Sequence, residues 1–181
     1  MKIITGIARG RKLEEPKGQK IRPTTGLVKE SIFNIIQFDI PGRRVLDLFA
    51  GTGQLGIEAL SRGAISCDFV DQSKDAIRLV QANLASTNLS GGRTWQTDAR
   101  SFIKRGETYD LIFIDPPYHF AAYDAIVQDI AAFDILSKNG IMVCEAELDS
   151  SLPMLDLPYK QKREYRYGRV KIAIYTRLAD S

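Results

Sequence analysis

The feature that most constrains the fold of this chain is an alternation of short apolar runs with helical stretches between residues 45 and 144. Alternation of this kind is typical of a parallel sheet covered by helices on both faces. Beyond residue 144 the pattern changes, and residues 159–177 predict two strands that add an antiparallel edge. The sequence therefore predicts a doubly wound α/β fold with seven strands. We expect strands at residues 45–48, 66–70, 93–96, 111–114 and 141–144 and in both halves of 159–177, and helices at 56–62, 74–84 and 123–136.

The first 24 residues form a separate pattern. Their loose alternation is broken by Gly6, Gly10, Pro16 and Gly18, which predicts a small β-hairpin extension ahead of a main domain over residues 25–181. Residues 1–30 carry eight Lys or Arg and three Asp or Glu, although the whole chain has a net charge of only +3. This excess of positive charge suits contact with phosphates.

A glycine-rich turn follows the first expected strand of the sheet. Gly51, Gly53 and Gly56 fit the pattern G-x-G-x-x-G, and Asp71 stands where a ribose-binding carboxylate is expected. Alone, this pattern is typical of a dinucleotide site. Asp47 argues against a dinucleotide, because it would place a carboxylate beside the pyrophosphate. The same carboxylate suits a ligand with a positive amino group and no phosphate, such as S-adenosylmethionine.

Each acid also has a plain structural alternative. Asp47 could cap the turn, and Asp71 could begin the helix that follows Ser73. We favour the ligand roles because both acids end consecutive strands on either side of one glycine loop. Asp98 ends the next expected strand and is placed to accept a hydrogen bond from an adenine amino group, although a helix cap explains it nearly as well.

The segment Asp115-Pro116-Pro117-Tyr118 follows the apolar run 111–114. Each proline has a fixed φ and no N–H, so the backbone carbonyls there can accept hydrogen bonds without a competing donor. Together with Asp115 they can hold the two hydrogens of an exocyclic amine in line for attack, and Tyr118 can stack on the base. The alternative is a Pro-Pro strand terminator followed by a solvated tyrosine.

A second basic stretch, residues 160–171, interleaves Lys and Arg with tyrosines, which can stack on and clamp nucleic acid. The interpretation that we favour is an edge strand whose charges prevent aggregation.

Composition excludes several classes of protein. No apolar run approaches the ~18 to 20 residues of a membrane span, and the first residues are too short an apolar stretch for a secretory signal, so we expect a cytoplasmic protein. Cys67 and Cys144 are isolated and His119 is the only histidine, which indicates neither a metal site nor a disulfide. We expect buried thiols and assign His119 no role as a general base.

With these residues in hand, the chain resembles the class I S-adenosylmethionine-dependent methyltransferases, and more closely the RsmD family, which methylates N2 of one guanine in bacterial 16S ribosomal RNA. The resemblance covers nearly the full length. It rests on residues 10–13, on Arg22-Pro23-Thr24-Thr25 with Lys29-Glu30 and Phe33-Asn34, on the loop 46–56 with residues 58–64, on the Asp115 tetrad and on Glu145-Ala146-Glu147.

The resemblance implies a Rossmann-like fold, S-adenosylmethionine as cofactor, and 16S ribosomal RNA as partner, within a 30S subunit or an assembly intermediate. It implies target-base handling by Asp115, Pro116, Pro117 and Tyr118. The expected cofactor contacts are Asp47, Phe49, Gly51, Gly53, Asp71, Gln72, Asp98 and Ala99. The expected RNA contacts lie in the arm, at Arg9, Arg11, Lys12, Arg22 and Thr24. A monomer without bound metal is the default expectation.

The chain departs from the usual family pattern at Gly26 and Leu27, where Asp-Arg is typical, and at Lys29, which replaces a common Arg and loses its bidentate fork. Other functions remain open: a DNA adenine or cytosine amino-methyltransferase, a protein glutamine methyltransferase, or a non-catalytic RNA-binding assembly factor. A nicotinamide-dependent dehydrogenase offers no role for Asp47 or the tetrad.

Overall fold

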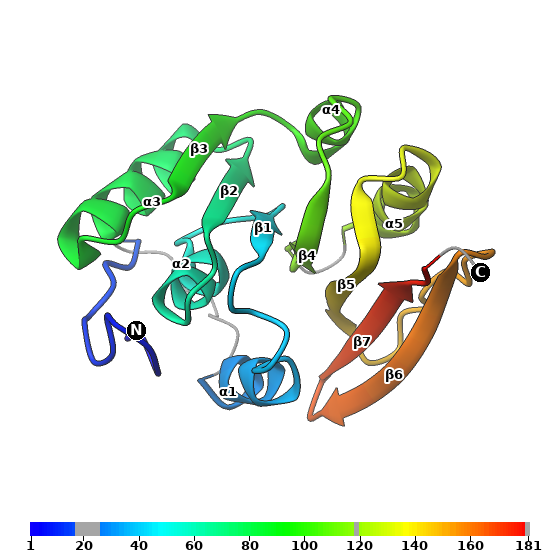
Figure 1. The fold of residues 1–181 in the computed structure, drawn as a ribbon, viewed down its shortest axis with the longest axis horizontal. Coiled ribbons are helices and arrows are strands. Elements are labelled where there is room, and N and C mark those ends of the chain that lie inside the picture. Colours follow the sequence, from blue (N-terminus) through cyan, green and yellow to red (C-terminus); the bar gives the residue numbers. More distant parts are fainter. Residues whose placement is uncertain (17–25, 118–119, 180–181) are drawn as a thin grey trace.

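The computed structural model describes residues 1–16, 26–117 and 120–179. Its centre is one seven-stranded sheet with the strand order β3-β2-β1-β4-β5-β7-β6 (Figure 1). The elements in chain order are α1 (Gly26–Ile35), β1 (Arg44–Asp47), α2 (Gln54–Ser61), β2 (Ser66–Asp71), α3 (Lys74–Thr87), β3 (Gly92–Gln96), α4 (Ala99–Ile103), β4 (Tyr109–Ile114), α5 (Tyr123–Ala132), β5 (Leu136–Glu147), β6 (Tyr159–Tyr167) and β7 (Val170–Arg177).

Strands β1 to β5 run parallel, and β7 pairs antiparallel with both β5 and β6. The predicted α/β fold is therefore confirmed. We call the edge at which β1 to β5 end the carboxyl edge, and the other the opposite edge. The β6–β7 turn lies at the carboxyl edge, because Val170 pairs with both Glu147, the last residue of β5, and Tyr167, the last residue of β6.

One predicted helix is longer than the structure allows. We expected a helix over residues 123–136, but α5 ends at Ala132 and Leu136 already belongs to β5. Asp134 between them has a φ of +49°, in the left-handed region, which a continuing helix cannot include. The apolar period alone did not show this break, because Leu136 is buried in its strand as it would be in a helix.

Two apolar cores cover the two faces of the sheet. One joins the sheet to the arm, α1, α2 and α3, and the other joins it to α4 and α5. Helix α2 packs unusually close to β2, because a Cβ at Gly56 would lie 2.3 Å from Phe69 Cε1. Only glycine fits there, which explains the third glycine of the motif as a packing requirement.

The arm, residues 1–16, folds back on itself but has only one antiparallel bridge, between Lys2 and Lys12. It is a hairpin-shaped segment rather than two regular strands over the residues described. Its side chains Ile3, Ala8 and Leu13 are buried in the same core as α2. The arm thus shares its core with the sheet.

A buried charge cluster joins the arm to the helices. The Glu58 carboxylate on α2 is fully buried, accepts the backbone N–H groups of Ile4 (2.8 Å) and Thr5 (2.9 Å), and pairs with Lys29 Nζ (3.0 Å) and Arg62 Nε (2.8 Å). Lys29, the residue that departs from the family's usual Arg, therefore lies inside the protein. It ties α1 to α2 rather than facing solvent.

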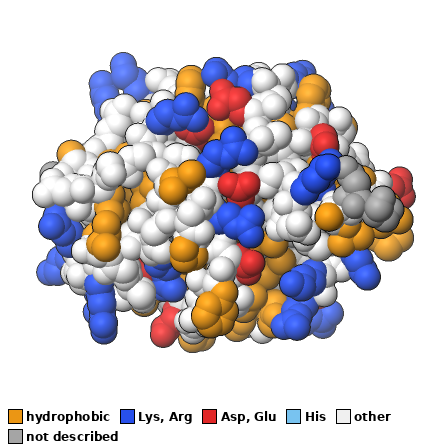
Figure 2. Space-filling model, in the orientation of Figure 1, with side chains coloured by type: hydrophobic (Ala, Val, Ile, Leu, Met, Phe, Trp, Pro, Cys, Tyr) orange, Lys and Arg blue, Asp and Glu red, His pale blue; other side chains and the backbone are white. Residues whose placement is uncertain are grey.

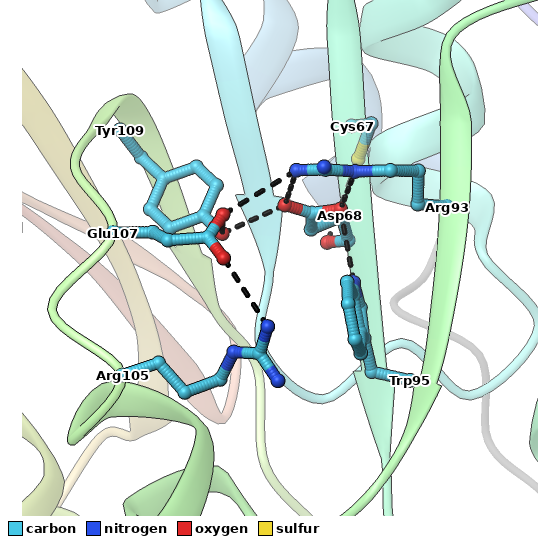
Figure 3. A network of polar contacts seen from close by, with 7 residues as sticks. All are labelled: Cys67, Asp68, Arg93, Trp95, Arg105, Glu107 and Tyr109. Atoms are coloured by element: carbon cyan, nitrogen blue, oxygen red, sulfur yellow. Dashed lines mark hydrogen bonds and ion pairs between the residues drawn. The ribbon is translucent and has the colours of Figure 1, made fainter.

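A second polar network lies on the face covered by α4 (Figure 3). Asp68 in β2 accepts hydrogen bonds from Arg93 Nε (2.7 Å) and Nη2 (2.6 Å), Trp95 Nε1 (3.0 Å) and the Tyr109 hydroxyl (2.7 Å). Arg105 extends the network by pairing with Glu107 and lying over the Trp95 ring. The network joins β2, β3 and β4 through side chains.

None of the described helices has the length and apolar character to span a bilayer.

Candidate active site

A cleft of about 1150 Å³ opens at the carboxyl edge. This is larger than the ~300–1,000 Å³ of a typical small-molecule pocket, so it has room for two ligands at once. Most of the residues predicted as cofactor or substrate contacts line it: Asp47, Phe49, Gly51, Asp71, Gln72, Asp98, Ala99, Asp115, Pro116 and Pro117. Tyr118 lies outside the described residues, so its predicted stacking role stays a prediction.

Asp47, the last residue of β1, is 2% exposed and forms part of the cleft wall. Its Oδ2 accepts the N–H of Gly56 at 3.0 Å, the one hydrogen bond to this side chain within the described part of the chain. The pKa of Asp47 is raised to about 7, mainly by burial; the Gly56 hydrogen bond opposes the rise, and the nearby Asp115 and Asp71 add to it. A cationic group in the cleft would stabilise the ionised form of Asp47 and lower its pKa.

Asp71, the last residue of β2, anchors the glycine loop. One carboxylate oxygen accepts the N–H of Gly51 at 3.0 Å, and the other accepts the N–H of Ser73 at 2.8 Å. Asp71 therefore contributes to the start of α3, the structural role that we weighed from sequence, and also lines the cleft. Each oxygen has further acceptor capacity for a ligand hydroxyl.

Gly53, predicted as a cofactor contact, is not among the described residues that line the cleft. It precedes α2 with a φ of +78°, where a Cβ would lie 3.1 Å from Ile57 Cδ1 and 3.2 Å from Val80 Cγ2. Both the backbone conformation and the packing select glycine. Gly53 shapes the loop, and its contact with a cofactor stays a prediction.

Asp98 caps α4, since its Oδ1 accepts the N–H of Ser101 at 3.0 Å. Hydrogen bonds from Ser101 lower the pKa of Asp98, so it is a carboxylate at neutral pH. The alternative role of helix cap is thus confirmed. Because Asp98 also lines the cleft, its contact with an adenine amino group stays a prediction.

Asp115, Pro116 and Pro117 follow β4 directly and reach the cleft from the middle of the sheet. An aromatic wall stands beside them: the rings of Phe49 and Phe120 meet edge to face with centroids 5.2 Å apart. Phe120 was not predicted as a site residue, because it follows the tetrad in a loop without periodicity. A flat ligand could pack against this wall.

The cleft is strongly acidic. Eight carboxylate side chains line it, and Arg100 is the one basic side chain among the described lining residues. Arg100 is itself paired with Asp129, at 2.6 Å between Nε and Oδ2. Four of the acids were not predicted as site residues: Asp124, Glu145, Glu147 and Asp149. A cleft of this charge favours cationic and amine ligands and disfavours phosphates.

Gln54, the first residue of α2, is a further site residue that sequence reasoning missed. It is 9% exposed and lines the cleft, and its Oε1 has no hydrogen-bond partner within the residues that the structure describes. A buried amide oxygen without a donor is costly, which suits a position that meets a ligand's N–H group. Nothing in the sequence distinguishes this glutamine from an ordinary helix residue.

The described RNA contacts predicted in the arm, Arg9, Arg11 and Lys12, are not among the residues that line the cleft, although Met1 of the arm is. The N–H of Ile7 donates to the carbonyl of Ser61, the last residue of α2, which stands near the start of β2 at the opposite edge. Arg9 is exposed on the same turn of the arm, and Arg11 donates to the carbonyl of Ser86 near the end of α3. Arg22 and Thr24 lie outside the described residues, and Lys12 is exposed beside the bridge to Lys2.

Known proteins resemble this chain along its whole length. The family described as "Conserved hypothetical protein 95" matches residues 1–176. The "Putative rRNA methyltransferase YlbH" of Bacillus subtilis is 39% identical, covering 97% of this chain and 98% of the relative. The "Ribosomal RNA small subunit methyltransferase D" of Escherichia coli is 31% identical, covering 99% and 91%.

Solved structures agree with these relatives. The "Putative methyltransferase yhhF from Escherichia coli" superposes with a TM-score of 0.89 at 31% identity, covering 99% of both chains. A protein from Pyrococcus horikoshii with 19% identity and a TM-score of 0.75 shares the fold. The strand order, the acid-lined cleft and these matches lead to one conclusion: the chain belongs to the Conserved hypothetical protein 95 family, the RsmD family that its motifs predicted.

Proposed function

We propose that this protein transfers a methyl group from S-adenosylmethionine to the exocyclic N2 amine of a guanine in small-subunit ribosomal RNA. The observation that carries the proposal is the meeting of Asp47, Asp71 and Asp98 with Asp115-Pro116-Pro117 in one cleft, each acid placed at or just beyond a strand end. The relatives named ribosomal RNA small subunit methyltransferase D support the substrate class.

The donor set of the cleft fits S-adenosylmethionine, which when bound supplies a methyl group on a positively charged sulfur. Asp47 and the unpartnered Oε1 of Gln54 would hold its amino group, since both are buried acceptors beside the glycine loop. Asp71 would accept from the ribose hydroxyls and Asp98 from the adenine amine. Among the described cleft-lining residues the one basic side chain, Arg100, is paired with Asp129, which agrees with a ligand that has no phosphate.

The Asp115 segment would hold the target base. Its carboxylate and the Pro116 carbonyl can accept both hydrogens of the guanine N2 amine and so direct the nitrogen lone pair toward the methyl group. The N–C bond forms as the bond from sulfur to carbon breaks, and the nitrogen then loses a proton. No general base is needed before transfer. The guanine must be unpaired or turned out of its stack to enter the cleft.

The first experiment measures transfer of labelled methyl from S-adenosylmethionine to ribosomal RNA, to 30S particles that lack the modification, to duplex DNA and to total protein. Digestion of labelled RNA to nucleosides should give N2-methylguanosine. Label in DNA or in protein would keep the role of Asp115 and overturn the substrate. Cofactor binding without transfer to any substrate would favour the non-catalytic assembly factor.

Asp115→Ala tests the assigned role within this reaction. We expect the transfer rate to fall by roughly 100- to 1,000-fold because the amine loses its acceptor, while calorimetric affinity for S-adenosylmethionine stays unchanged. Asp75→Ala is the matched control, because the Asp75 side chain is 92% exposed on α3 and outside the cleft. Loss of cofactor binding together with activity in Asp115→Ala would mean that the residue is structural.

A further inference from the structure

We propose that the tip of the β6–β7 hairpin, residues 165–171, is a docking surface for the sugar-phosphate backbone of the RNA that carries the target base. This inference rests on the proposed function and adds a contact surface that the sequence alone did not favour. Three observations support it: the position of the hairpin tip, the hydrogen bonds that hold the tip, and its positive charge beside an acidic cleft.

The register places the tip at the mouth of the cleft. Glu147 at the end of β5 lines the cleft and pairs with Val170, which pairs in turn with Tyr167. Strand β6 begins with Tyr159 opposite Arg177 at the other edge of the sheet. The basic residues of β6 are therefore spread from the opposite edge to the carboxyl edge, and only the last of them, Arg166, lies near the site.

Two hydrogen bonds, one from the backbone and one from a side chain, hold the tip against the cleft wall. The N–H of Leu148 donates to the carbonyl of Arg169 at 2.9 Å, and Lys171 Nζ donates to the carbonyl of Ser150. Ser150 and its neighbour Asp149 both line the cleft. The tip is thus fixed relative to the site, so a backbone bound there would keep a constant distance from a base in the cleft.

The charge of the tip is complementary to RNA where the cleft is not. Arg166 and Arg169 are both exposed, and the side chain of Arg166 remains 74% exposed although it pairs with Glu164 at 3.3 Å. In the lower right of Figure 2, Lys and Arg side chains group where Figure 1 places β6 and β7. Phosphates repelled by eight cleft carboxylates would find exposed cations at this tip.

Two tyrosines add a surface for bases or sugars. Tyr165 and Tyr167 are half-buried and pack on the core beneath the hairpin. Half-buried rings are rigid, so stacking on them costs little side-chain entropy. The Arg163 guanidinium donates to the Tyr165 hydroxyl at 3.2 Å and orients it.

Protection of an edge strand also explains the charges on β6, and it makes a different prediction. Protection needs charge along the strand, without preference for one end. Docking of RNA needs positive charge only at the end of the strand that lies at the carboxyl edge. Lys160 and Lys162 are exposed on the same strand toward the opposite edge, so they provide a control that is matched in charge and exposure.

The experiment compares the double variants R166Q/R169Q and K160Q/K162Q in methyl transfer to unmodified 30S particles over a range of KCl concentrations. For R166Q/R169Q we expect the KM for particles to rise about tenfold, and the salt dependence of log KM to become shallower by about two. K160Q/K162Q should match the wild type. R166K/R169K, which keeps both charges, should restore most of the affinity.

Cofactor affinity and urea unfolding of each variant separate docking from folding. Equal behaviour of the two glutamine pairs, or an R166Q/R169Q defect that follows lost stability, would overturn the docking surface. Wild-type protein that methylates no ribosomal RNA would instead overturn the proposed function, so the two failures are distinguishable.

Discussion

Asp47 and Asp68 stand on neighbouring strands and are each only 2% exposed, yet their surroundings are opposite. Burial by itself would raise the pKa of either carboxyl. For Asp68 the hydrogen bonds from Arg93, Trp95 and Tyr109 outweigh the effect of burial, so the net result is a lowered pKa. Asp47 has one backbone donor, and its pKa is raised to about 7. A buried acid saturated with donors is structural, whereas a buried acid short of donors at a cleft is available to a ligand.

The largest effect that this comparison predicts is a loss of stability in Asp68→Ala. The change leaves the Trp95 N–H and the Tyr109 hydroxyl without their acceptor, and it removes the partner of Arg93. We expect the free energy of unfolding to fall by about 2–4 kcal/mol, below the full range for a buried pair because Arg93 is 57% exposed. Urea unfolding measures it.

Methyl transfer per folded molecule should be nearly unchanged in Asp68→Ala, as expected for a residue outside the cleft. A variant of wild-type stability would show that the donors find other partners and that the contrast with Asp47 is overstated. Tyr109→Phe removes a single donor to Asp68, so its free energy of unfolding should lie between those of the wild type and Asp68→Ala.

Asp47→Asn should have the reverse profile. The amide keeps the size of the side chain and an acceptor for Gly56, so we expect stability at pH 8 to be equal to or above that of the wild type. Affinity for S-adenosylmethionine should fall by about 1.5–3 kcal/mol, the range for a hydrogen bond to a charged group. Calorimetry with the cofactor and urea unfolding measure the two effects. An unstable variant with normal affinity would make Asp47 a structural acid like Asp68.

The remaining effect is in the pH dependence of stability. The pKa of Asp47 is raised from 3.8 to about 7, so the folded protein holds this proton more tightly than the unfolded chain. The stability that it contributes is present below about pH 4 and is lost as the pH rises to about 7. Asp68 has a lowered pKa, so its contribution is present above about pH 4 and is lost as the pH falls.

Urea unfolding of the wild type and Asp47→Asn at pH 5, 6, 7 and 8 isolates this term. The stability of the variant relative to the wild type should increase from pH 5 to pH 8, because only the wild type loses the Asp47 contribution. Parallel pH profiles would mean that Asp47 keeps an ordinary pKa in the folded protein.

The strands and half of the cleft acids were predictable from sequence, because parallel strands place their carboxyl ends at one edge and Asp47, Asp71 and Asp115 stand at those ends. The position of the arm was not predictable. It depends on Glu58 and Ser61 of α2, which accept backbone N–H groups from residues more than 50 positions earlier. A basic composition alone did not show which edge the arginines of the arm would face.

Gln54 and Phe120 were missed for a related reason. Neither belongs to a pattern of charge or period, and each becomes a site residue only when the loops around it close. The glycines were identified as a motif, but the sequence did not show that Gly53 serves the turn and Gly56 the contact between helix and sheet. Such packing roles depend on Phe69 and Val80, which are distant in sequence.

The two cysteines of the chain, Cys67 and Cys144, are both fully buried, and burial raises the pKa of each thiol. A thiol that is inaccessible and protonated reacts slowly with maleimides. A cysteine introduced at Arg169 or Lys160 would therefore be the single reactive thiol on the native protein. Fluorophores or photocrosslinkers can be attached at either end of the β6–β7 hairpin without first removing the native cysteines.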